Sequence, residues 1–331
     1  MKQQGTWPAS SEASHFSSLR FGQIPKLPST PHHHRRPKFP PPSSSNSSPF
    51  SLLPSDILTK IAASFNYPDL RSASLVCKSW RDSLTPLREA MLFLVWGKKF
   101  KHGSGGVRVN KNKALDSFLK GVYLGSTLAM VDAGLLYWEL GKKEEGIRLY
   151  MKAADLGDPA GQCNLGISFL RVEPPNPEEA VKWLYKASIA GHSRAQYQLA
   201  LCLHQGRGLR RNIAEAAKWY LRAAEGGYVR AMYNTSLCYS FGEGLPKSLR
   251  HAKKWMKRAA DRGHTKAQYE YGLGLFSKGD MMNALVFLEL ATRAGEIVAA
   301  DIRNFVLGHL SEGSRDAAMQ LVDNWRPMPS K

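Results

Sequence analysis

Hydrophobic positions along the chain fall into one short block and one long periodic region. In the short block, residues 53–81, apolar side chains recur at spacings of three and four, as at Ile57, Ile61 and Phe65. Such spacing places side chains on one face of an α-helix. The block therefore predicts two or three short helices, which bury little surface by themselves and need a partner to complete their core.

Local signals set the expected ends of these helices. Either Ser55 or Asp56 can cap the first helix, because both accept hydrogen bonds from free backbone N–H groups. Pro68 disfavours helical geometry in the residue before it, so we expect a break there. Asp69 is then expected to cap the second helix. One further helix is expected over 86–101.

This block resembles an F-box. The family's pattern opens with Leu-Pro-x-Asp and closes with Val-Cys-Lys-x-Trp-Arg, and residues 53–56 and 76–81 reproduce both ends with intact spacing. The resemblance implies docking onto a Skp-type adaptor within a cullin–RING (SCF) ubiquitin ligase, with the rest of the chain presenting a protein substrate. The residues expected to contact the adaptor, or to shape the contact, are Leu53, Pro54, Ile57, Leu58, Ile61, Leu70, Val76 and Trp80.

The long region, residues 110–310, repeats one helical pattern every 32 to 36 residues. A small residue lies four positions after each marker glycine, and a bulky apolar residue lies eight positions before all but the first of them. Each unit is predicted to be two antiparallel helices, and about six stacked units would form an all-α solenoid. The marker glycines, placed where the chain must turn with positive φ, are Gly125, Gly157, Gly191, Gly227, Gly263 and Gly295.

These units resemble Sel-one-like repeats, which are relatives of the tetratricopeptide repeat. The best copy of that family's signature is AADRGHTKAQY, residues 259–269. The resemblance implies a protein-binding scaffold whose concave face holds the substrate. Both resemblances together indicate a plant-type F-box protein. A different class of function stays open, namely an interaction scaffold that binds the adaptor without driving degradation.

The N-terminal tail is poor in hydrophobic residues and rich in Ser and Pro, so it is predicted to be disordered. Its single acidic residue, Glu12, among many Ser and several Lys and Arg also suits an organelle transit peptide. The run His32–His34 is interpreted as polar filler without partners. The expected divisions are a tail over 1–49, the F-box over 50–86, a helix and linker over 87–109, repeats over 110–310, and a capping helix over 311–331.

The net charge of +19 makes the chain basic, so nucleic acid and acidic proteins are considered as partners. Cations recur nine and five positions before four consecutive marker glycines, which predicts a basic stripe along the solenoid. The stripe is either a solvated outer face or a track for an acidic or phosphorylated partner. Nucleic acid is disfavoured, because aromatic residues are not expected beside these cations. The stripe residues are Arg148, Lys152, Lys182, Lys186, Lys218, Arg222, Lys254 and Arg258.

Candidate chemistry is sparse. The four cysteines, Cys77, Cys163, Cys202 and Cys238, have no metal-ligand spacing, and the last three occupy packing slots of the repeat. No nucleophile–base–acid set or phosphate loop is found, so we expect no catalytic residue, cofactor or metal. No apolar run reaches the roughly 20 residues that span a bilayer. Nucleus, cytoplasm or both are the expected locations.

Overall fold

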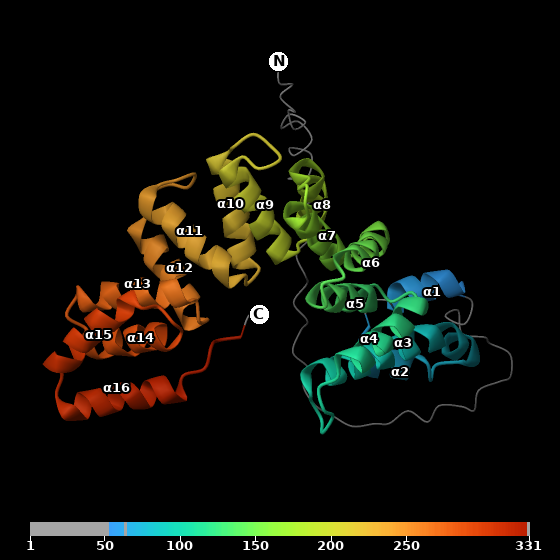
Figure 1. Ribbon diagram of the computed structural model, residues 1–331, viewed down its shortest axis with the longest axis horizontal. Coiled ribbons are helices and arrows are strands. Elements are labelled where there is room, and N and C mark those ends of the chain that lie inside the picture. The colour runs from blue at the N-terminus through green and yellow to red at the C-terminus, as the bar shows by residue number, and fades with distance from the viewer. Residues whose placement is uncertain (1–52, 63–64, 330–331) are drawn as a thin grey trace, which may run out of the picture. The chain divides into compact units, whose positions relative to one another are not determined.

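The computed structural model describes residues 53–62 and 65–329, and within those ranges it contains helices and no strand (Figure 1). This confirms the expected all-α class. The N-terminal tail, including His32–His34, lies outside the described residues. The chain divides into two compact units, one up to Ala129 and one from Met130 onward, and each is described by itself.

The first unit is built around one long helix. That helix, α3, packs against all three other complete helices of the unit. Where α3 packs on α1 and α2, the core consists of Leu58, Ala62, Leu70 and Leu84, each at most 2% exposed. The helices are α1 (Ser55–Ala62), α2 (Tyr67–Ala73), α3 (Lys78–His102) and α4 (Lys111–Tyr123).

Two expected boundaries in this unit are wrong. Asn66 caps α2, since its side chain accepts a hydrogen bond of 2.9 Å from the backbone N–H of Asp69. Asp69 therefore lies in the first turn, and Pro68 stands at the helix start, where its missing N–H costs nothing. The second correction concerns α3, which begins at Lys78 rather than Pro86 and continues through that proline.

The second unit is a stack of helices of nearly uniform length. Residues 127–129 of its first helix, α5, fall in the first unit. The helices are α5 (Thr127–Glu139), α6 (Lys143–Asp155), α7 (Pro159–Arg171), α8 (Pro177–Ile189), α9 (Ser193–Gln205), α10 (Ile213–Glu225), α11 (Val229–Phe241), α12 (Leu249–Asp261), α13 (Thr265–Phe276), α14 (Met281–Arg293), α15 (Val298–His309) and α16 (Glu312–Asn324). Five complete helix pairs lie between the six marker glycines.

The turn at each marker glycine follows the expected geometry. Gly157 and Gly191, for example, have φ of 82° and 84°, a region that other residues resist. The small residue four positions later allows close helix contact: a Cβ added to Gly161 would lie 2.6 Å from the Cβ of Ala153. In later repeats the same position is a fully buried alanine, as at Ala195 and Ala231.

Large side chains eight positions before the glycines fill the spaces between helices. Trp219 and Trp255 are 5% and 6% exposed. Phe287 packs edge-on against Tyr271, with ring centroids 4.9 Å apart. Trp219 also packs edge-on against Tyr185 of the preceding repeat, with ring centroids 6.4 Å apart. Contacts of this kind occur both within a repeat and between neighbouring repeats, as stacking of helix pairs requires.

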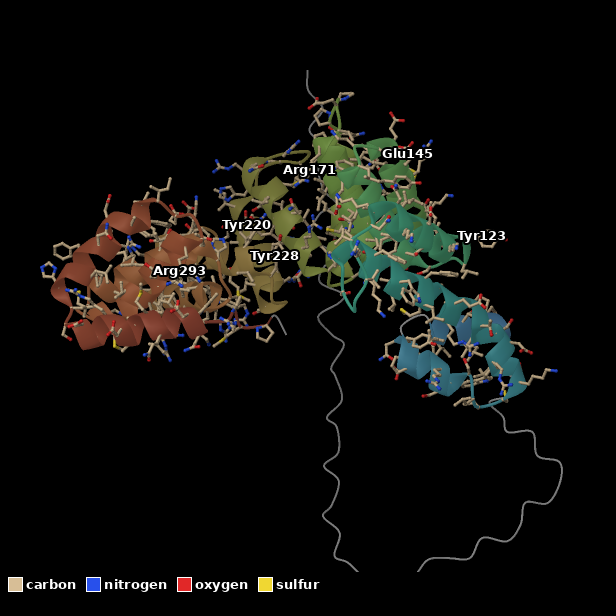
Figure 2. The ribbon with its side chains drawn as sticks, turned by 60° about the horizontal axis from the view of Figure 1, so that its bottom comes forward. Tyr123, Glu145, Arg171, Tyr220, Tyr228 and Arg293 are labelled. Carbon is tan, nitrogen blue, oxygen red and sulfur yellow. The ribbon has the colours of Figure 1, made fainter. Side chains whose placement is uncertain are left out.

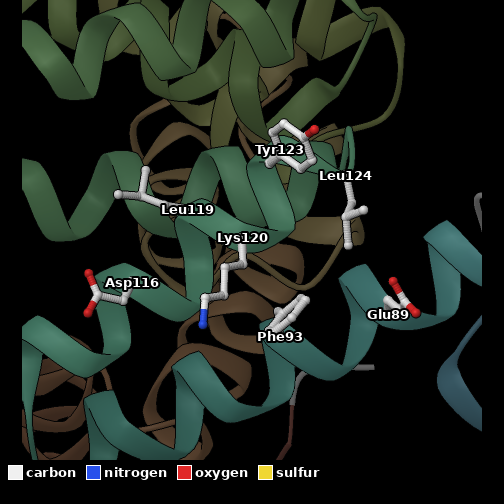
Figure 3. Close-up of a pocket in the computed structure, with 7 residues that line it drawn as sticks. All are labelled: Glu89, Phe93, Asp116, Leu119, Lys120, Tyr123 and Leu124. Carbon is white, nitrogen blue, oxygen red and sulfur yellow. The ribbon is translucent and has the colours of Figure 1, made fainter.

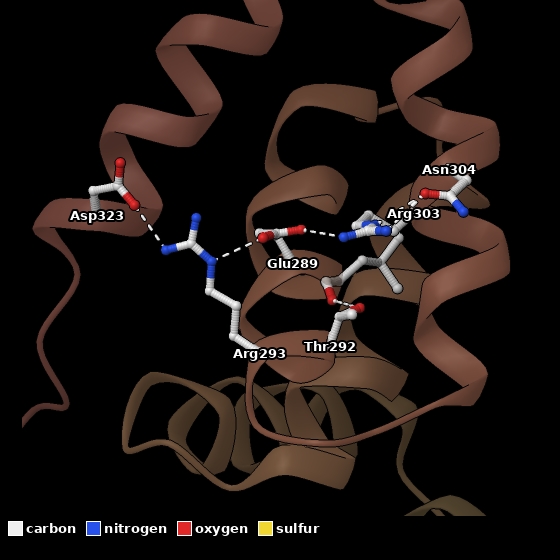
Figure 4. Close-up of polar contacts among 7 residues, drawn as sticks. Glu289, Thr292, Arg293, Arg303, Asn304 and Asp323 are labelled. Atoms are coloured by element: carbon white, nitrogen blue, oxygen red, sulfur yellow. Dashed lines mark hydrogen bonds and ion pairs between the residues drawn. The ribbon is translucent and has the colours of Figure 1, made fainter.

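The C-terminal end of the stack is joined by a charged network (Figure 4). Glu289 on α14 is 5% exposed and accepts hydrogen bonds from Arg293, at 2.8 Å, and from Arg303 on α15, at 3.0 Å. Arg293 also binds Asp323 on α16 at 2.7 Å. Helices α14, α15 and α16 are thus linked through one buried carboxylate.

Buried cysteines contribute to packing in this unit. Burial raises the pKa of Cys163 to about 12 and the pKa values of Cys202 and Cys238 to about 11. A thiol with so high a pKa is a poor nucleophile and a poor metal ligand at neutral pH. The three cysteines are therefore buried in the packing positions that the repeat pattern predicts.

Candidate functional site

Four of the eight expected adaptor-contact residues lie on or near the surface of α1 and the turn that follows α2. Pro54 is exposed, and Ile57 and Ile61 are 39% and 51% exposed. The two isoleucines are four residues apart and share one face of α1. Val76, in the turn between α2 and α3, is 57% exposed. The first unit thus leaves several large apolar side chains exposed at these positions.

The other expected residues support this surface from beneath. Leu58 and Leu70 are buried in the core of the first unit, and Trp80 packs against that core while partly exposed. Leu53 is half-buried at the edge of the described segment. The structure thus separates the predicted set into exposed side chains and side chains that hold them in place.

Sequence reasoning missed one exposed residue. Leu75 is 71% exposed, although it is not among the residues expected to contact the adaptor. The helix ends at Ala73, and Ser74 fixes the end by donating its hydroxyl to the carbonyl of Leu70 at 2.7 Å. Leu75 therefore lies beyond the helix, in the turn with Val76, and a serine followed by two apolar residues was the available signal.

The basic stripe contains a repeated cation–tryptophan contact. Lys186 Nζ lies 4.0 Å from the ring centroid of Trp183, and the Cζ atoms of Arg222 and Arg258 lie 4.6 and 4.8 Å from the centroids of Trp219 and Trp255. The expectation that aromatic residues do not accompany these cations is wrong. Two of the three indoles are almost fully buried, so they do not offer free ring faces for stacking nucleobases.

The remaining stripe residues differ in their partners. Lys182 pairs with Glu179 at 2.9 Å, and Arg148 with Glu145 at 3.6 Å. Within the described chain, Lys152, Lys218 and Lys254 form no ion pair or ring contact, and all three are exposed. Exposed pairs of this kind contribute little stability. The stripe therefore contains both engaged and available cations.

The two histidines at the repeat turns cap helices. His192 Nδ1 accepts a 3.2 Å hydrogen bond from the N–H of Ala195 and His264 Nδ1 one from Ala267. Burial lowers the pKa of both rings, and neighbouring Arg194 and Arg230 lower it further. Neutral imidazoles in these caps are structural groups. In the described part of the chain, no three His, Cys, Asp or Glu side chains gather to hold a metal.

Aromatic rings pack around the first helices of the middle repeats. Tyr197 on α9 packs against Tyr220 on α10, of the same repeat, and against Tyr228, which precedes α11, with centroid distances of 5.8 and 4.9 Å. Tyr220 and Tyr228 are labelled in Figure 2. One repeat further along, Tyr233 stacks on His264 at 4.6 Å and donates a 2.6 Å hydrogen bond to Glu270. These rings fix the repeat-to-repeat geometry.

A shallow cleft of about 540 Å³ lies between α3 and α4 of the first unit (Figure 3). Phe93, Leu119 and Tyr123 supply its apolar lining, and the ammonium group of Lys120 covers the Phe93 ring at 5.6 Å. This cleft contributes apolar surface without a converging set of polar groups.

Searched over the described residues, no helix has the length and apolar character needed to cross a bilayer.

Comparison with protein families assigns both parts of the chain. Residues 50–88 match the F-box domain. The Sel1 repeat matches five times, over residues 128–158, 159–192, 193–228, 229–264 and 266–296. Each matched repeat coincides with one helix pair of the second unit, from α5–α6 to α13–α14.

Individual proteins agree with these assignments. The F-box protein At1g70590 of Arabidopsis thaliana is 60% identical, over 99% of both chains. Two solved structures share the fold: c5321, a protective antigen of uropathogenic Escherichia coli, and a Sel1 repeat protein of Oxalobacter formigenes. Their TM-scores are 0.60 and 0.57 and their identities 20% and 22%, covering 82% and 69% of this chain and 63% and 100% of theirs. The chain belongs to the F-box proteins that carry Sel1 repeats.

Proposed function

We propose that this protein is the substrate-recognition subunit of an SCF-type ubiquitin ligase. The F-box docks a Skp-type adaptor, and through it a cullin, while the Sel1 repeats bind a protein substrate. In this arrangement the chain performs no chemical step itself. Its action is to hold a substrate near the ubiquitin-transfer machinery of its partners, in the nucleus, the cytoplasm or both.

The observation that carries the proposal is the exposed apolar surface within the F-box match. Ile57, Ile61, Leu75 and Val76 are exposed, whereas Leu58, Ala62, Leu70 and Leu84 of the same unit are buried. Burial of such side chains by a partner is favourable by about 25 cal/mol for each Å² removed from water. F-box domains generally bind Skp-type adaptors, so that adaptor is the expected partner.

The test is adaptor capture by a surface variant. In Ile57→Asp/Val76→Asp, two charges replace exposed apolar side chains, and we expect affinity for purified Skp-type adaptor to fall by about a hundredfold or more. The charge is placed on exposed positions, so the unit should remain folded. Calorimetric titration measures the affinity, and circular dichroism checks the helix content.

Two further chains complete this experiment. Ile189→Asp is the matched control, because Ile189 is 63% exposed and lies at the end of α8, far from the F-box in sequence. It should retain full adaptor affinity. Normal adaptor binding by Ile57→Asp/Val76→Asp would refute the docking assignment. A second variant, Leu53→Ala/Pro54→Ala, is expressed in cells to measure the levels of partner proteins. If the unaltered chain binds the adaptor but these levels are the same with the variant as with the unaltered chain, the non-degradative scaffold is favoured instead.

A further inference from the structure

The loops that join the two helices of a repeat cover the preceding repeat in the middle of the solenoid. The seven-residue loops 206–212 and 242–248 join α9 to α10 and α11 to α12. Gly244 lies so close to the start of α10 that an added Cβ would be 2.7 Å from the Cβ of Ala217. Leu209 and Leu245 from the two loops pack against the same core cluster. Each loop thus closes the N-terminal half of a preceding second helix.

The next loop is too short to do the same. Only four residues, 277–280, join α13 to α14. The N-terminal half of α12, which this loop would cover, borders a groove of about 420 Å³ between α11, α12 and α13. Leu249, Met256 and Tyr271 contribute its apolar lining, and Leu249 is 59% exposed.

Two positions of the repeat frame differ from the other repeats at this groove. Eleven positions after the marker glycine, the other repeats carry a buried side chain, such as Leu136 or Cys202, whereas α13 has the exposed Gly274. A Cβ built on Gly274 would meet nothing within 4 Å. Ten positions before the glycine, buried Val181 and Ala217 are replaced by the exposed Lys253.

The charges around the groove are predominantly positive. Lys253, Lys254 and Lys278 line it and are exposed, and within the described chain they form no ion pair with an acidic side chain. Lys257 is held by Asp261 at 2.8 Å, and the one carboxylate in the lining, that of Glu270, accepts a hydrogen bond from Tyr233. The apolar lining therefore has a cationic rim.

The start of α12 adds to this bias. Helices α6, α8 and α10 carry glutamates in their first turns, as the helix dipole favours, but α12 has no acidic residue there. It has Arg250 and His251 instead. The N-terminal tail of this chain is basic too, so charge argues against that tail as the occupant. An acidic ligand complements the groove.

We propose that the groove between α11, α12 and α13 binds an acidic peptide segment of a protein partner, with one large apolar side chain seated between Leu249, Met256 and Tyr271. Carboxylates or phosphates on either side of that side chain pair with Lys253, Lys254 and Lys278. The proposal refines the substrate-binding role assigned to the repeats, and it rests on that proposed function.

The test uses the full purified chain and a fluorescein-labelled decapeptide with a central Phe flanked by Asp and Glu. Fluorescence anisotropy at 0.1 M salt measures its affinity. Lys253→Glu/Lys278→Glu should weaken binding about tenfold, because two cations facing the peptide become anions. The stripe variant Lys152→Glu/Lys218→Glu makes the same charge change elsewhere and should stay within about twofold of the unaltered chain.

A cavity-filling variant tests the apolar half of the proposal. Gly274→Leu places a side chain in the groove at a helical position with open space, so the fold should be retained and peptide binding should fall about tenfold. Gly308→Leu is its matched control, since a Cβ on Gly308, in α15, also meets nothing within 4 Å. A peptide with Ser in place of Phe should bind about tenfold more weakly to the unaltered chain.

Several results would overturn the proposal. They are no binding by the unaltered chain, equal binding of the Ser peptide, unchanged binding by Gly274→Leu, and equal losses in the groove and stripe charge variants. A dT decamer that binds more tightly than the peptide and depends on the same lysines would make nucleic acid the occupant. Adaptor affinity measured on the same samples separates this outcome from failure of the ligase assignment, because the groove variants leave the F-box unaltered.

Discussion

At the scale of single residues, the repeat turns depend on side chains that cap helices. Asp158, His192 and His264 stand directly after marker glycines, and each accepts hydrogen bonds from the first turn of the following helix. An aspartate can do this over a wide pH range, whereas imidazole can do it only while neutral. The choice of residue at this slot therefore decides how each turn responds to acid.

The histidine caps predict a pH effect on stability. Folding lowers the pKa of His192 and His264 below 6.5, so their stabilising contribution is complete above pH 6.5 and is lost as the pH falls through the lower folded values. His192→Asn/His264→Asn should remove this dependence, since asparagine caps without titrating. Relative to the unaltered chain, the free energy of unfolding of the variant should be higher at pH 5.5 than at pH 7.5 by about 0.5 to 1 kcal/mol for each cap.

Thermal unfolding of both chains at the two pH values provides the check. Nearby charges are part of the comparison: Arg194 and Asp158 act on His192, and Arg230 and Lys266 act on His264. These groups stay the same in the variant, so the difference between the chains isolates the imidazoles. An identical pH dependence in both chains would contradict the capping role.

At the scale of helices, the C-terminal end of the solenoid depends on the carboxylate of Glu289. Burial raises its pKa, but hydrogen bonds from Arg293 and Arg303 outweigh burial and the net pKa lies below the ordinary value. The carboxylate is thus charged at neutral pH and joins α14 to α15 directly and to α16 through Arg293. Loss of that charge affects three helices together.

Glu289→Gln should destabilise the second unit by about 1 to 3 kcal/mol at pH 7, because two guanidinium groups lose their shared charged acceptor. The difference should shrink as the pH falls below 4.5, where the native carboxyl also begins to lose its advantage. Urea unfolding followed by circular dichroism measures it. The exposed Glu225→Gln is the control, and an equal loss in the two variants would refute the network's role.

The helical repeat was predictable because its signals are local. Gly157 and Gly191 mark turns that need positive φ, and the small residues after them mark close contacts, so spacing alone reveals both. The cation–tryptophan contacts could also have been predicted, since Trp219 and Arg222 are three residues apart on one helix. The start of α3 was harder, because Pro86 is a break signal that packing of Leu84 and Ala90 overrides.

The candidate binding surfaces were only partly predictable. Leu58 and Ile61 are both large aliphatic residues and lie three positions apart on α1, yet Leu58 is buried and Ile61 is exposed. Only the packing of α1 against α3 decides between them. The groove beside α12 depends on the short loop 277–280, which does not cover it, and a short loop by itself does not reveal a groove in the sequence.

At the scale of the whole molecule, the two compact units have separate cores. Leu84→Ala should lower the stability of the F-box unit, and Leu199→Ala that of the repeats, each by about 2 to 5 kcal/mol, since both leucines are at most 1% exposed. Differential scanning calorimetry of the full chain should show each substitution moving a different transition. If both move the same transition, the units unfold together and the separate-core interpretation is wrong.

The uneven loops have a consequence for how such arrays diversify. Second helices α6, α8, α10, α12 and α14 each contain 13 residues, while the loops before them vary in length. Insertions and deletions are therefore tolerated at one edge of the stack without changing the spacing of the helices. Over generations, a chain of this design can open or close a recess beside any repeat by gaining or losing a few codons, and so acquire new binding partners while its framework stays the same.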